Sequence, residues 1–316
     1  MTIPSGLGSQ AGCKIESTYG TRVAPDRFFK IISENVKKRQ DQLWSKGIGA
    51  GRRTEHQVNL GKSWVEGPVV MEFGPQNVGI LLRSGFGAIN TTGTNPYTHV
   101  ATPGDLGDDS ATWQFNRPDE SGTDRPFDYT GLMVTSWELA LKAGELAMLT
   151  LNLYGQKEDA GQTLAAVSYV AGFTPFTFIH GALTIGGSAY VCDDITLRGN
   201  NNLATGRHVI TSTNPGLPLQ PKEGTARRSY TADINSDFHS LTEYNRAIAN
   251  TDAALSLALT NGSTSFTVAG NVASTVDTPV TPGPGMLKYK LPVAFYHATS
   301  DASAITATLV NADAAA

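Results

Sequence analysis

The segment Leu132–Tyr154 alternates apolar and other side chains with a period of two, and this pattern constrains the fold more than any other feature of the chain. Before the tripeptide Lys142–Gly144 the odd-numbered positions carry Trp137 and other large side chains, and after it they carry Leu149 and Leu151. Successive side chains of a β-strand point to opposite faces of the sheet. The pattern therefore predicts a β-hairpin with one buried face and one open face.

The register of this hairpin follows from the parity of its apolar positions. Because both strands are apolar at odd positions, paired residue numbers must sum to an even value if those side chains are to share a face. A three-residue loop, Lys142–Gly144, meets this condition with Gly144 in the left-handed conformation, and it places Trp137 opposite Leu149. The other face is then moderately polar and contains Ser136, Glu138, Thr150 and Asn152.

A second hairpin is predicted in Ala253–Ala269 around Asn261-Gly262, a dipeptide typical of two-residue hairpin turns. The same parity argument sets Leu257 against Phe266. Runs of β-branched and aromatic residues bounded by turn residues predict further strands. These strands are expected within residues 27–32, 62–73, 176–198, 227–237, 286–297 and 305–311. The chain should therefore be mainly β.

Two short helices are expected beside these strands. Ser33–Trp44 is compatible with a short helix, and a second helix should begin at Ser240. Ser240 and Glu243 have the spacing of a capping box, in which each side chain accepts a backbone N–H of the first turn. The apolar stripe of this second helix contains Leu241, Tyr244 and Ile248.

Three segments lack a periodicity of their own. Residues 1–60 are interpreted as an arm that packs on something else, and residues 278–285 as a stiff, proline-rich connection. Residues 84–129 are polar and rich in Gly, Pro and Asp, which indicates a long loop. Loops longer than about 12–15 residues are usually functional or disordered, so this loop should either make contacts in an assembly or be flexible.

Composition excludes several classes of function. A net charge of −4 argues against a nucleic-acid-binding surface, and the two cysteines, Cys13 and Cys192, form no disulfide or metal framework. The six histidines have no metal-ligand spacing, and no nucleophile elbow, phosphate-binding loop or paired acid and base is present. We therefore expect no cofactor and no catalysis. No apolar run approaches the ~18 residues of a membrane span, and Met1–Gly12 lacks the features of a secretory signal.

Charge is distributed unevenly along the chain. Residues 1–60 contain ten Lys and Arg against five Asp and Glu, whereas residues 61–316 contain fourteen against twenty-three. Such polarity lets the basic segment of one copy meet the acidic face of another, although a solvated surface with chance clustering explains it equally well. The candidate inter-subunit residues are Arg22, Arg27, Lys37, Lys38, Arg39, Arg52, Arg53, Asp105, Asp108 and Asp109.

The order of short motifs resembles the major tail tube proteins of long, non-contractile-tailed bacteriophages, over roughly residues 16–311. Each motif is weak by itself, and their order is the specific signal. The matching segments are Glu16–Thr21, Phe28–Glu34, Gly47–Arg53, Trp64–Gly67 with Phe73, Gly79–Gly85 as a "G-x-L-L-x-x-G" turn, Tyr97–His99, Ser110–Phe115, Asp128–Gly155, Asp193–Leu203 and Asp237–Tyr244. Many members of the family are shorter than this chain.

The resemblance implies a β-sandwich or barrel fold with a flanking short helix, long extended arms and loops, and inner sheets that join across subunits into one continuous barrel. Residues 1–60 would be the inter-subunit arm, 61–311 the tail-tube domain and 312–316 a C-terminal tail. Six copies would form a ring, and stacked rings would form the tube through which the genome leaves. The implied partners are further copies of the chain, the tape measure protein, and the tail terminator and distal tail proteins. Assembly in the cytoplasm of the host bacterium and a place in the virion tail are also implied.

Phage DNA should pass through such a tube without specific binding. Cationic contacts to phosphates produce tight, salt-dependent binding, so a basic lumen would stall the DNA. We therefore predict a neutral to acidic lumen lined in part by Ser136, Glu138, Thr150 and Asn152, the polar face of the central hairpin. An alternative places the sheet formed by residues 181–198 in the lumen, with Asp193 or Asp194 facing the DNA.

Other functions remain compatible with the sequence. A tube subunit of a contractile tail or secretion machine would share the fold and differ only in the presence of a sheath. A carbohydrate-binding β-sandwich would need an exposed aromatic platform, but Trp44, Trp64, Trp113 and Trp137 are scattered along the chain. A β-sandwich hydrolase is disfavoured because the adjacent Asp193 and Asp194 point to opposite faces of a strand.

Overall fold

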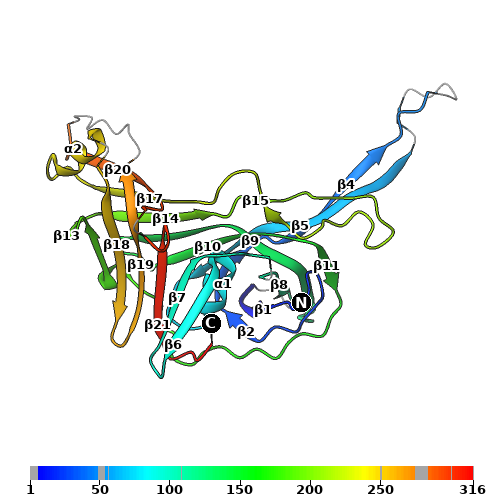
Figure 1. The fold of residues 1–316 in the computed structure, drawn as a ribbon. Helices are drawn as coiled ribbons and strands as arrows, with labels where there is room; N and C mark the ends of the chain where they lie inside the picture. The colour runs from blue at the N-terminus through cyan, green and yellow to red at the C-terminus, as the bar shows by residue number, and fades with distance from the viewer. Residues whose placement is uncertain are drawn as a thin grey trace.

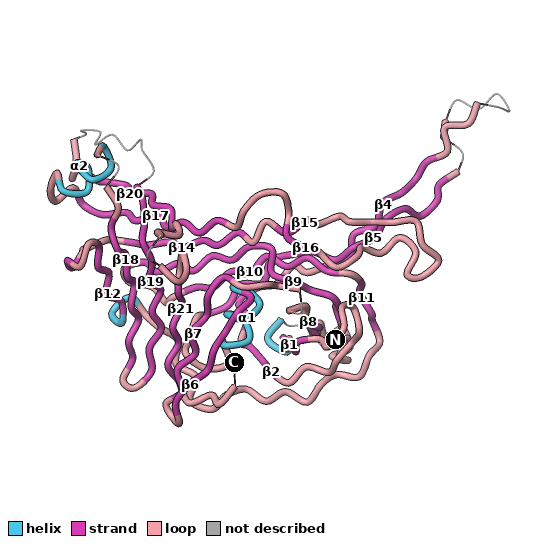
Figure 2. The backbone as a smooth tube through the Cα atoms, in the orientation of Figure 1, coloured by secondary structure: helices cyan, strands magenta, loops and turns pink. Residues whose placement is uncertain are grey.

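The protein is built almost entirely from antiparallel strands, as its computed structural model shows (Figures 1 and 2). The structure describes residues 6–48, 54–55, 57–107, 109–249, 251–274, 284–299 and 301–315. Within these ranges the α-helices are α1 (Gly79–Phe86) and α2 (Thr242–Ile248), and the 3₁₀ turns are Gly6–Gly8 and Phe178–His180. The predicted mainly β fold is confirmed.

The first sheet contains the central hairpin. β9 (Pro126–Lys142) pairs with β10 (Met148–Gly155) on one side and with β14 (Asp194–Asn200) on the other. Beyond β10 lies β5 (Val58–Glu72), which carries β3 (Ile31–Glu34) and β4 (Lys37–Trp44) on its outer edge. Beyond β14 lie β17 (Ser229–Asp237) and β20 (Lys288–Phe295). In the connection from β14 to β17, β15 (Leu203–Ala204) pairs with β16 (Lys222–Glu223).

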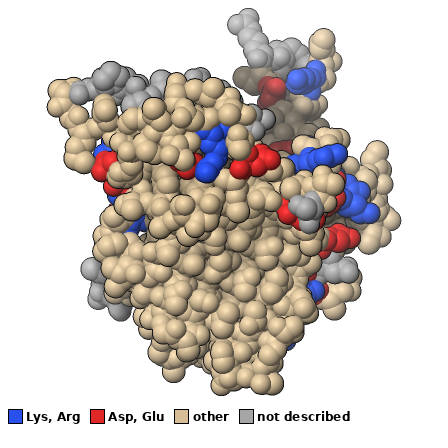
Figure 3. Space-filling model, turned by 60° about the vertical axis from the view of Figure 1, so that its left-hand side comes forward, with Lys and Arg blue, Asp and Glu red and all other residues tan. Residues whose placement is uncertain are grey.

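The second sheet packs against the first and is joined to it where β19 pairs with the end of β20. Its order is β6 (Gly87–Gly93), β7 (Tyr97–Pro103), β21 (Thr306–Asn311), β19 (Thr264–Ser274), β18 (Ala253–Asn261), β12 (Gly181–Ile185) and β13 (Ser188–Ala189). None of these strands contains Lys, Arg, Asp or Glu. Figure 3 shows a broad uncharged surface on this side of the molecule, with the charged side chains gathered mostly along its margins.

The core fills the space between the two sheets. Phe73, which directly follows β5 of the first sheet, packs edge to face on Phe266 of β19, with ring centroids 4.8 Å apart. Helix α1 lies inside this layer, where Phe86 packs on Trp137 at 5.3 Å. The family motif predicts a turn at Gly79–Gly85, but the segment forms this helix. Its side chains are almost all buried, so helix formation satisfies backbone groups that a buried turn would leave unpaired.

A third, smaller sheet shares β9 with the first. Its order is β2 (Arg27–Phe29), β1 (Ala11–Ile15), β8 (Ala111–Asn116), the N-terminal half of β9, and β11 (Lys157–Ala160). β9 passes from this sheet into the first near Gly131, whose φ is +70°. One strand therefore holds two sheets together, and a glycine marks the crossing.

The faces predicted for both hairpins are correct, but the individual partners are not. Leu151 lies opposite Trp137, and Phe266 lies opposite Leu259, each two positions from the expected partner. In both hairpins the turn lies one residue further along the chain than predicted. This moves each residue's partner by two positions, so the same side chains still share a face. Gly144 has the expected positive φ of +87°.

Two predictions for the N-terminal half are wrong. The segment 33–44 does not form a helix, because β3 and β4 pair with the edge of β5. Residues 84–129 are not a long loop, because they contain the end of α1, the strands β6, β7 and β8, and the start of β9. β7 pairs with the distant strand β21 and β8 with the distant strand β1, whereas β6 and β7 form a local hairpin that lacks apolar alternation.

The helix expected near Ser240 is present as α2, but the face that packs on the protein is not the expected one. Leu241 and Ile248 of the expected apolar stripe are 57% and 63% exposed, whereas Glu243 and Ala247 are buried. Glu243 forms no capping box, because its carboxylate binds Arg246 at 2.8 Å.

The domain boundary at residue 60 remains a prediction, but the N-terminal segment is not wholly an arm. Phe28, Phe29 and Val36 are buried in the body of the protein, so β1, β2 and β3 belong to the packed fold. Only the distal parts of β4 and β5 project as a two-stranded ribbon (Figure 1). At the other terminus, the Asp313 carboxylate accepts the Asn77 backbone N–H at 2.7 Å, so the chain there also packs on the body.

Gly131→Ala should destabilise the protein by roughly 2–3 kcal/mol. A Cβ at position 131 would lie 2.9 Å from the Tyr19 ring. The alanine would also have to keep a positive φ, which is unfavourable for any residue with a Cβ. Gly144→Ala is the matched control, because its Cβ would meet nothing within 4 Å and only the backbone penalty of about 1 kcal/mol remains. Urea denaturation measures both, and equal losses would contradict the role given to Gly131.

Candidate assembly and lumen surfaces

The outer face of the first sheet gathers most of the residues predicted for a lumen. Glu138 lies between Thr150 of β10 and Arg198 of β14, and Ser136 lies between Asn152 and Asn200. All four predicted side chains point away from the sandwich core, and they are partly or fully exposed. The alternative residue Asp194 pairs with Lys142 on the same face. The rest of the alternative segment does not join this sheet, because β12 and β13 (residues 181–189) pair with β18 in the second sheet. Asp193 directly precedes β14.

Every cation on this face of β9, β10, β14, β17 and β20 contacts a carboxylate. The ion pairs join Arg198 to Glu138 (2.8 Å) and Asp233 (2.6 Å), Lys290 to Asp233 (3.6 Å), Lys288 to Asp193 and Asp237 (both 2.7 Å), and Lys142 to Glu145 (2.8 Å). Exposed ion pairs add little stability. They do neutralise the cations, so the face offers no surplus positive charge to a polyanion.

The ion pairs keep these cations protonated and fill their hydrogen-bonding positions with carboxylates. Hydrogen bonds to Asp193 and Asp237 raise the pKa of Lys288. Burial by itself would lower the pKa of Arg198, but its hydrogen bonds to Asp233 and Glu138 raise it. A phosphate approaching either side chain must compete with carboxylates that already fill its hydrogen-bonding positions.

The ribbon formed by the ends of β4 and β5 is the second candidate surface. Trp44 pairs with Val58, and Leu60 pairs with Gln42, so three apolar side chains share one face of the ribbon. Trp44, Val58 and Leu60 are 48%, 46% and 76% exposed. An isolated two-stranded ribbon is marginally stable in water, and exposed apolar clusters of this kind mark contact surfaces.

Three predicted inter-subunit cations lie at the base of this ribbon. Arg39 donates to Glu66 at 3.0 Å. Lys37 and Lys38 are exposed and form no ion pair with the part of the chain that the structure describes.

The remaining inter-subunit candidates are dispersed, and some already have partners within the chain. Arg22 forms an ion pair with the fully buried Asp128, and Asp109, 3% exposed, binds Arg83 at 2.7 Å. Arg27 lies 3.7 Å from Asp26. Asp105 accepts the Gly107 backbone N–H at 2.8 Å. Arg52, Arg53 and Asp108 lie outside the described residues.

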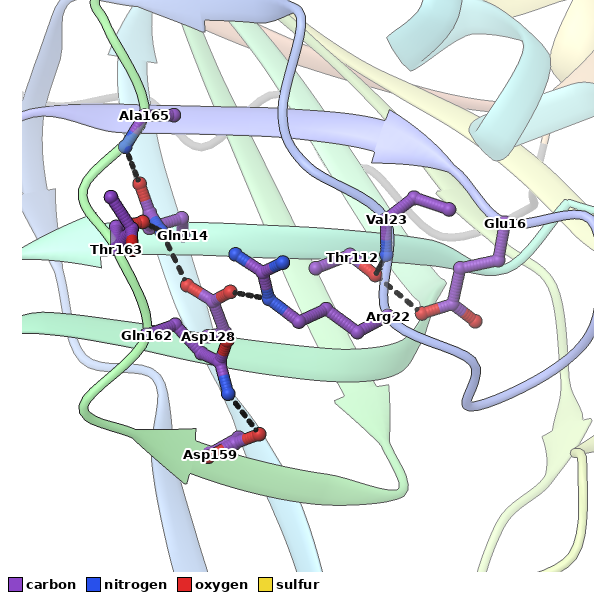
Figure 4. A network of polar contacts seen from close by, with 10 residues as sticks. All are labelled: Glu16, Arg22, Val23, Thr112, Gln114, Asp128, Asp159, Gln162, Thr163 and Ala165. Atoms are coloured by element: carbon purple, nitrogen blue, oxygen red, sulfur yellow. Dashed lines mark hydrogen bonds and ion pairs between the residues drawn. The ribbon is translucent and has the colours of Figure 1, made fainter.

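A buried polar network that the sequence analysis did not identify ties the N-terminal segment to β8 and β9 (Figure 4). The Glu16 carboxylate is 4% exposed and accepts hydrogen bonds from Ser110 Oγ (2.9 Å), Thr112 Oγ1 (2.8 Å) and the backbone N–H groups of Gly20 (2.8 Å) and Gly131 (2.9 Å). Both oxygens are thereby satisfied without a cation. Glu16 and Gly20 belong to the first family motif, so the motif contained this signal.

The network continues from Arg22 through Asp128 (Figure 4). Asp128 accepts a hydrogen bond from Gln114 Nε2 at 2.7 Å, and Gln114 Oε1 accepts the Ala165 backbone N–H at 2.8 Å. These contacts connect the segment before β2 to the segment after β11. They hold the N-terminal residues on the body before any assembly.

The described residues contain neither a metal-binding cluster nor a membrane-spanning helix. No group of His, Cys, Asp or Glu in those ranges could hold a metal ion. No helix within them has the length and apolar character required to cross a membrane.

Glu16→Gln should lower the free energy of unfolding by about 1–3 kcal/mol. Each carboxylate oxygen accepts one backbone N–H, so an amide must turn its NH₂ toward one of these donors and leave it unsatisfied. Glu145→Gln is the control, because the Glu145 carboxylate is exposed and forms an ion pair with the exposed Lys142. Urea denaturation compares the two, and a loss in Glu145→Gln as large as that in Glu16→Gln would refute the prediction.

Comparison with known proteins agrees with this architecture. No curated protein matches the chain. The family described as "Phage tail tube protein" matches residues 6–309, which is nearly the whole chain. Because this match covers well over half of the sequence, the chain belongs to the phage tail tube protein family and is a structural component of the virion tail.

Proposed function

We propose that this protein polymerises as stacked rings of six copies to form the tube of a long, non-contractile phage tail, through which the genome passes into the host. The family assignment supports the tube role. The ring number and the non-contractile tail rest on the resemblance stated above. Rotational closure would build each ring, and a head-to-tail contact that does not close would stack one ring on the next.

The outer face of the first sheet is the proposed lumen surface. Its residues are Ser136, Glu138, Thr150 and Asn152, with Asp193 and Asp194 at the margin. The observation that carries this assignment is the pairing of Lys142, Arg198, Lys288 and Lys290 with carboxylates on a face that is otherwise polar. DNA carries one charge per ~1.7 Å of its axis, so a surface without surplus cations lets it slide without tight binding.

The first sheet has margins at which a further copy can continue it. β20 pairs with β17 along one edge, and on its other edge only residues 293–295 pair with β19. At the opposite margin, β3 and β4 pair only with β5 among the described strands. Joining such margins between copies would close the inner sheet into a continuous barrel and remove its exposed edges.

The proposed setting follows from this role. Assembly would occur in the cytoplasm of the host bacterium, with the tape measure protein guiding tube length. The tail terminator and distal tail proteins would bind the two ends of the tube.

Tubes assembled from Glu138→Lys protein should retain short duplex DNA about tenfold more strongly at low salt than wild-type tubes do. The substitution removes one carboxylate from Arg198 and adds one cation per copy to the proposed lumen, and each cation offers a phosphate contact. Co-sedimentation across a salt titration measures retention. Glu120→Lys, in an exposed turn away from this face, is the matched control, and equal retention by both tubes would reject the lumen assignment.

The double variant Trp44→Ala, Leu60→Ser should reduce polymerisation at least tenfold and leave the stability of the monomer unchanged within about 0.5–1 kcal/mol. Both side chains are exposed on one face of the ribbon, so their loss removes a contact between copies and little core packing. Light scattering and negative-stain microscopy measure assembly. Leu43→Ala, on the other face of the ribbon, is the control, and normal tubes from the double variant would count against the ribbon as a contact.

A further inference from the structure

A partly open groove lies at the end of the molecule opposite the ribbon. It has a volume of about 340 Å³ and lies between β12, the end of β9 and the start of β14. Its lining is mainly apolar and includes Phe178 and Val191, which are 44% and 72% exposed. Asp193 and Asp194 lie in the same lining and give it an acidic side.

The strand beside this groove has an incomplete edge. β13 pairs only with residues 184–185 of β12. Gly181 and Ala182 have β18 on one side and no ladder on the other within the described chain. The groove therefore combines exposed apolar side chains with backbone positions open to an added strand, and both features favour an extended, partly apolar occupant.

The ribbon has the complementary chemistry. Trp44, Val58 and Leu60 form its exposed apolar face, and Lys37, Lys38 and Lys46 form no ion pair within the described residues. Asp194 in the groove is held by Asn235 at 2.7 Å and likewise forms no ion pair among those residues. Apolar anchors flanked by cations would thus meet an apolar groove flanked by the Asp194 carboxylate, whereas Asp193 in the same lining is already paired with Lys288.

Geometry excludes docking within one copy. Figure 1 shows β4 projecting from one end of the molecule and β13 lying at the other. The eight residues of β4 extend about 25 Å, away from the groove. A contact between these two surfaces must therefore join two copies head to tail, and such a contact propagates because each copy keeps a free ribbon or a free groove.

The surface around the groove also favours the ribbon of another copy as the occupant. Ala182 and Thr184 line the groove and also belong to the outer face of the second sheet, whose strands contain no charged residue. No cation on these strands would repel the lysines of an incoming ribbon, and burying small neutral side chains carries a low desolvation cost.

From these observations we propose that the ribbon of one copy docks in the groove beside β12 of the next copy, with the Trp44 face of the ribbon turned into the groove. This inference rests on the proposed tube function and names the two surfaces that meet. The contact is heterologous, because the ribbon of one copy meets the groove of the next, and it therefore links successive copies. Neither surface includes the first sheet's outer face beside Ser136 and Glu138.

A cysteine already present in the groove provides the test. Cys192 lines the groove, is partly exposed and forms no disulfide. Gln42→Cys places a second thiol on the ribbon face that carries Trp44, and Asn59→Cys places one on the opposite face as a matched control. Both positions are exposed, so both variants should fold. Burial raises the pKa of Cys192 to about 11, so assembled tubes are oxidised with diamide at pH 9 to increase the reactive thiolate.

Gln42→Cys tubes should show a ladder of covalent oligomers on non-reducing gels, at least tenfold more intense than that of Asn59→Cys tubes. Adding Cys192→Ser should abolish the ladder. Intact tubes without this ladder, or equal ladders from both ribbon positions, would overturn the groove as the docking site and leave the tube function standing. Failure of the wild-type chain to form tubes under any condition would overturn both proposals.

A second pair of variants tests the groove without cysteine chemistry. Val191→Arg fills the groove with a cationic side chain, and Ile210→Arg introduces the same side chain at another exposed apolar position. Val191→Arg should reduce tube elongation at least tenfold with an unchanged monomer melting temperature, whereas Ile210→Arg should assemble normally. Normal elongation by Val191→Arg would refute the proposal.

Discussion

The backbone pairing of one long strand, β9, determines how the rest of this protein is arranged. Its N-terminal half pairs with β8 and β11, and its C-terminal half pairs with β10 and β14. Its seventeen residues thus belong to two sheets, and the positive φ of Gly131 lies at the crossing. Because side chains alternate along a strand, this pairing also decides that Trp137 and Leu139 enter the core while Ser136 and Glu138 face outward.

The outer faces of the two large sheets differ in charge. The first sheet carries charged residues, and the cations of β9, β14 and β20 are matched to carboxylates, as in the Glu138–Arg198–Asp233 group. The second sheet carries no charge on any strand, which lowers the cost of covering it. A broad uncharged sheet face and a ribbon with an exposed Trp44 are liabilities for an isolated protein, and they become useful when copies of the chain cover one another.

The alternation of apolar side chains within a strand predicted which face is buried, whereas exact registers and features set by distant partners were not predicted. Alternation identified the buried and open faces of both hairpins, but the pairing of Leu151 with Trp137 depended on a turn placed one residue later. β6 and β7 escaped detection because polar residues and glycine interrupt their apolar pattern, and because β7 pairs with β21, some two hundred residues away. The helix α2 was predicted, but its expected apolar stripe was wrong, because Leu241 and Ile248 face outward while Glu243 and Ala247 pack inward. For the candidate surfaces, the polar hairpin face was predicted, whereas the Glu16 network and the groove beside β12 required contacts between distant segments.

Helical reconstruction of purified tubes by electron cryomicroscopy tests the central claim most directly, because it locates every surface of one copy relative to its neighbours. The account predicts that the face carrying Ser136, Glu138, Thr150 and Asn152 lines the channel and that each projecting ribbon is buried on an adjacent copy. A tube with this face turned outward, with the ribbons free in solvent, would contradict it.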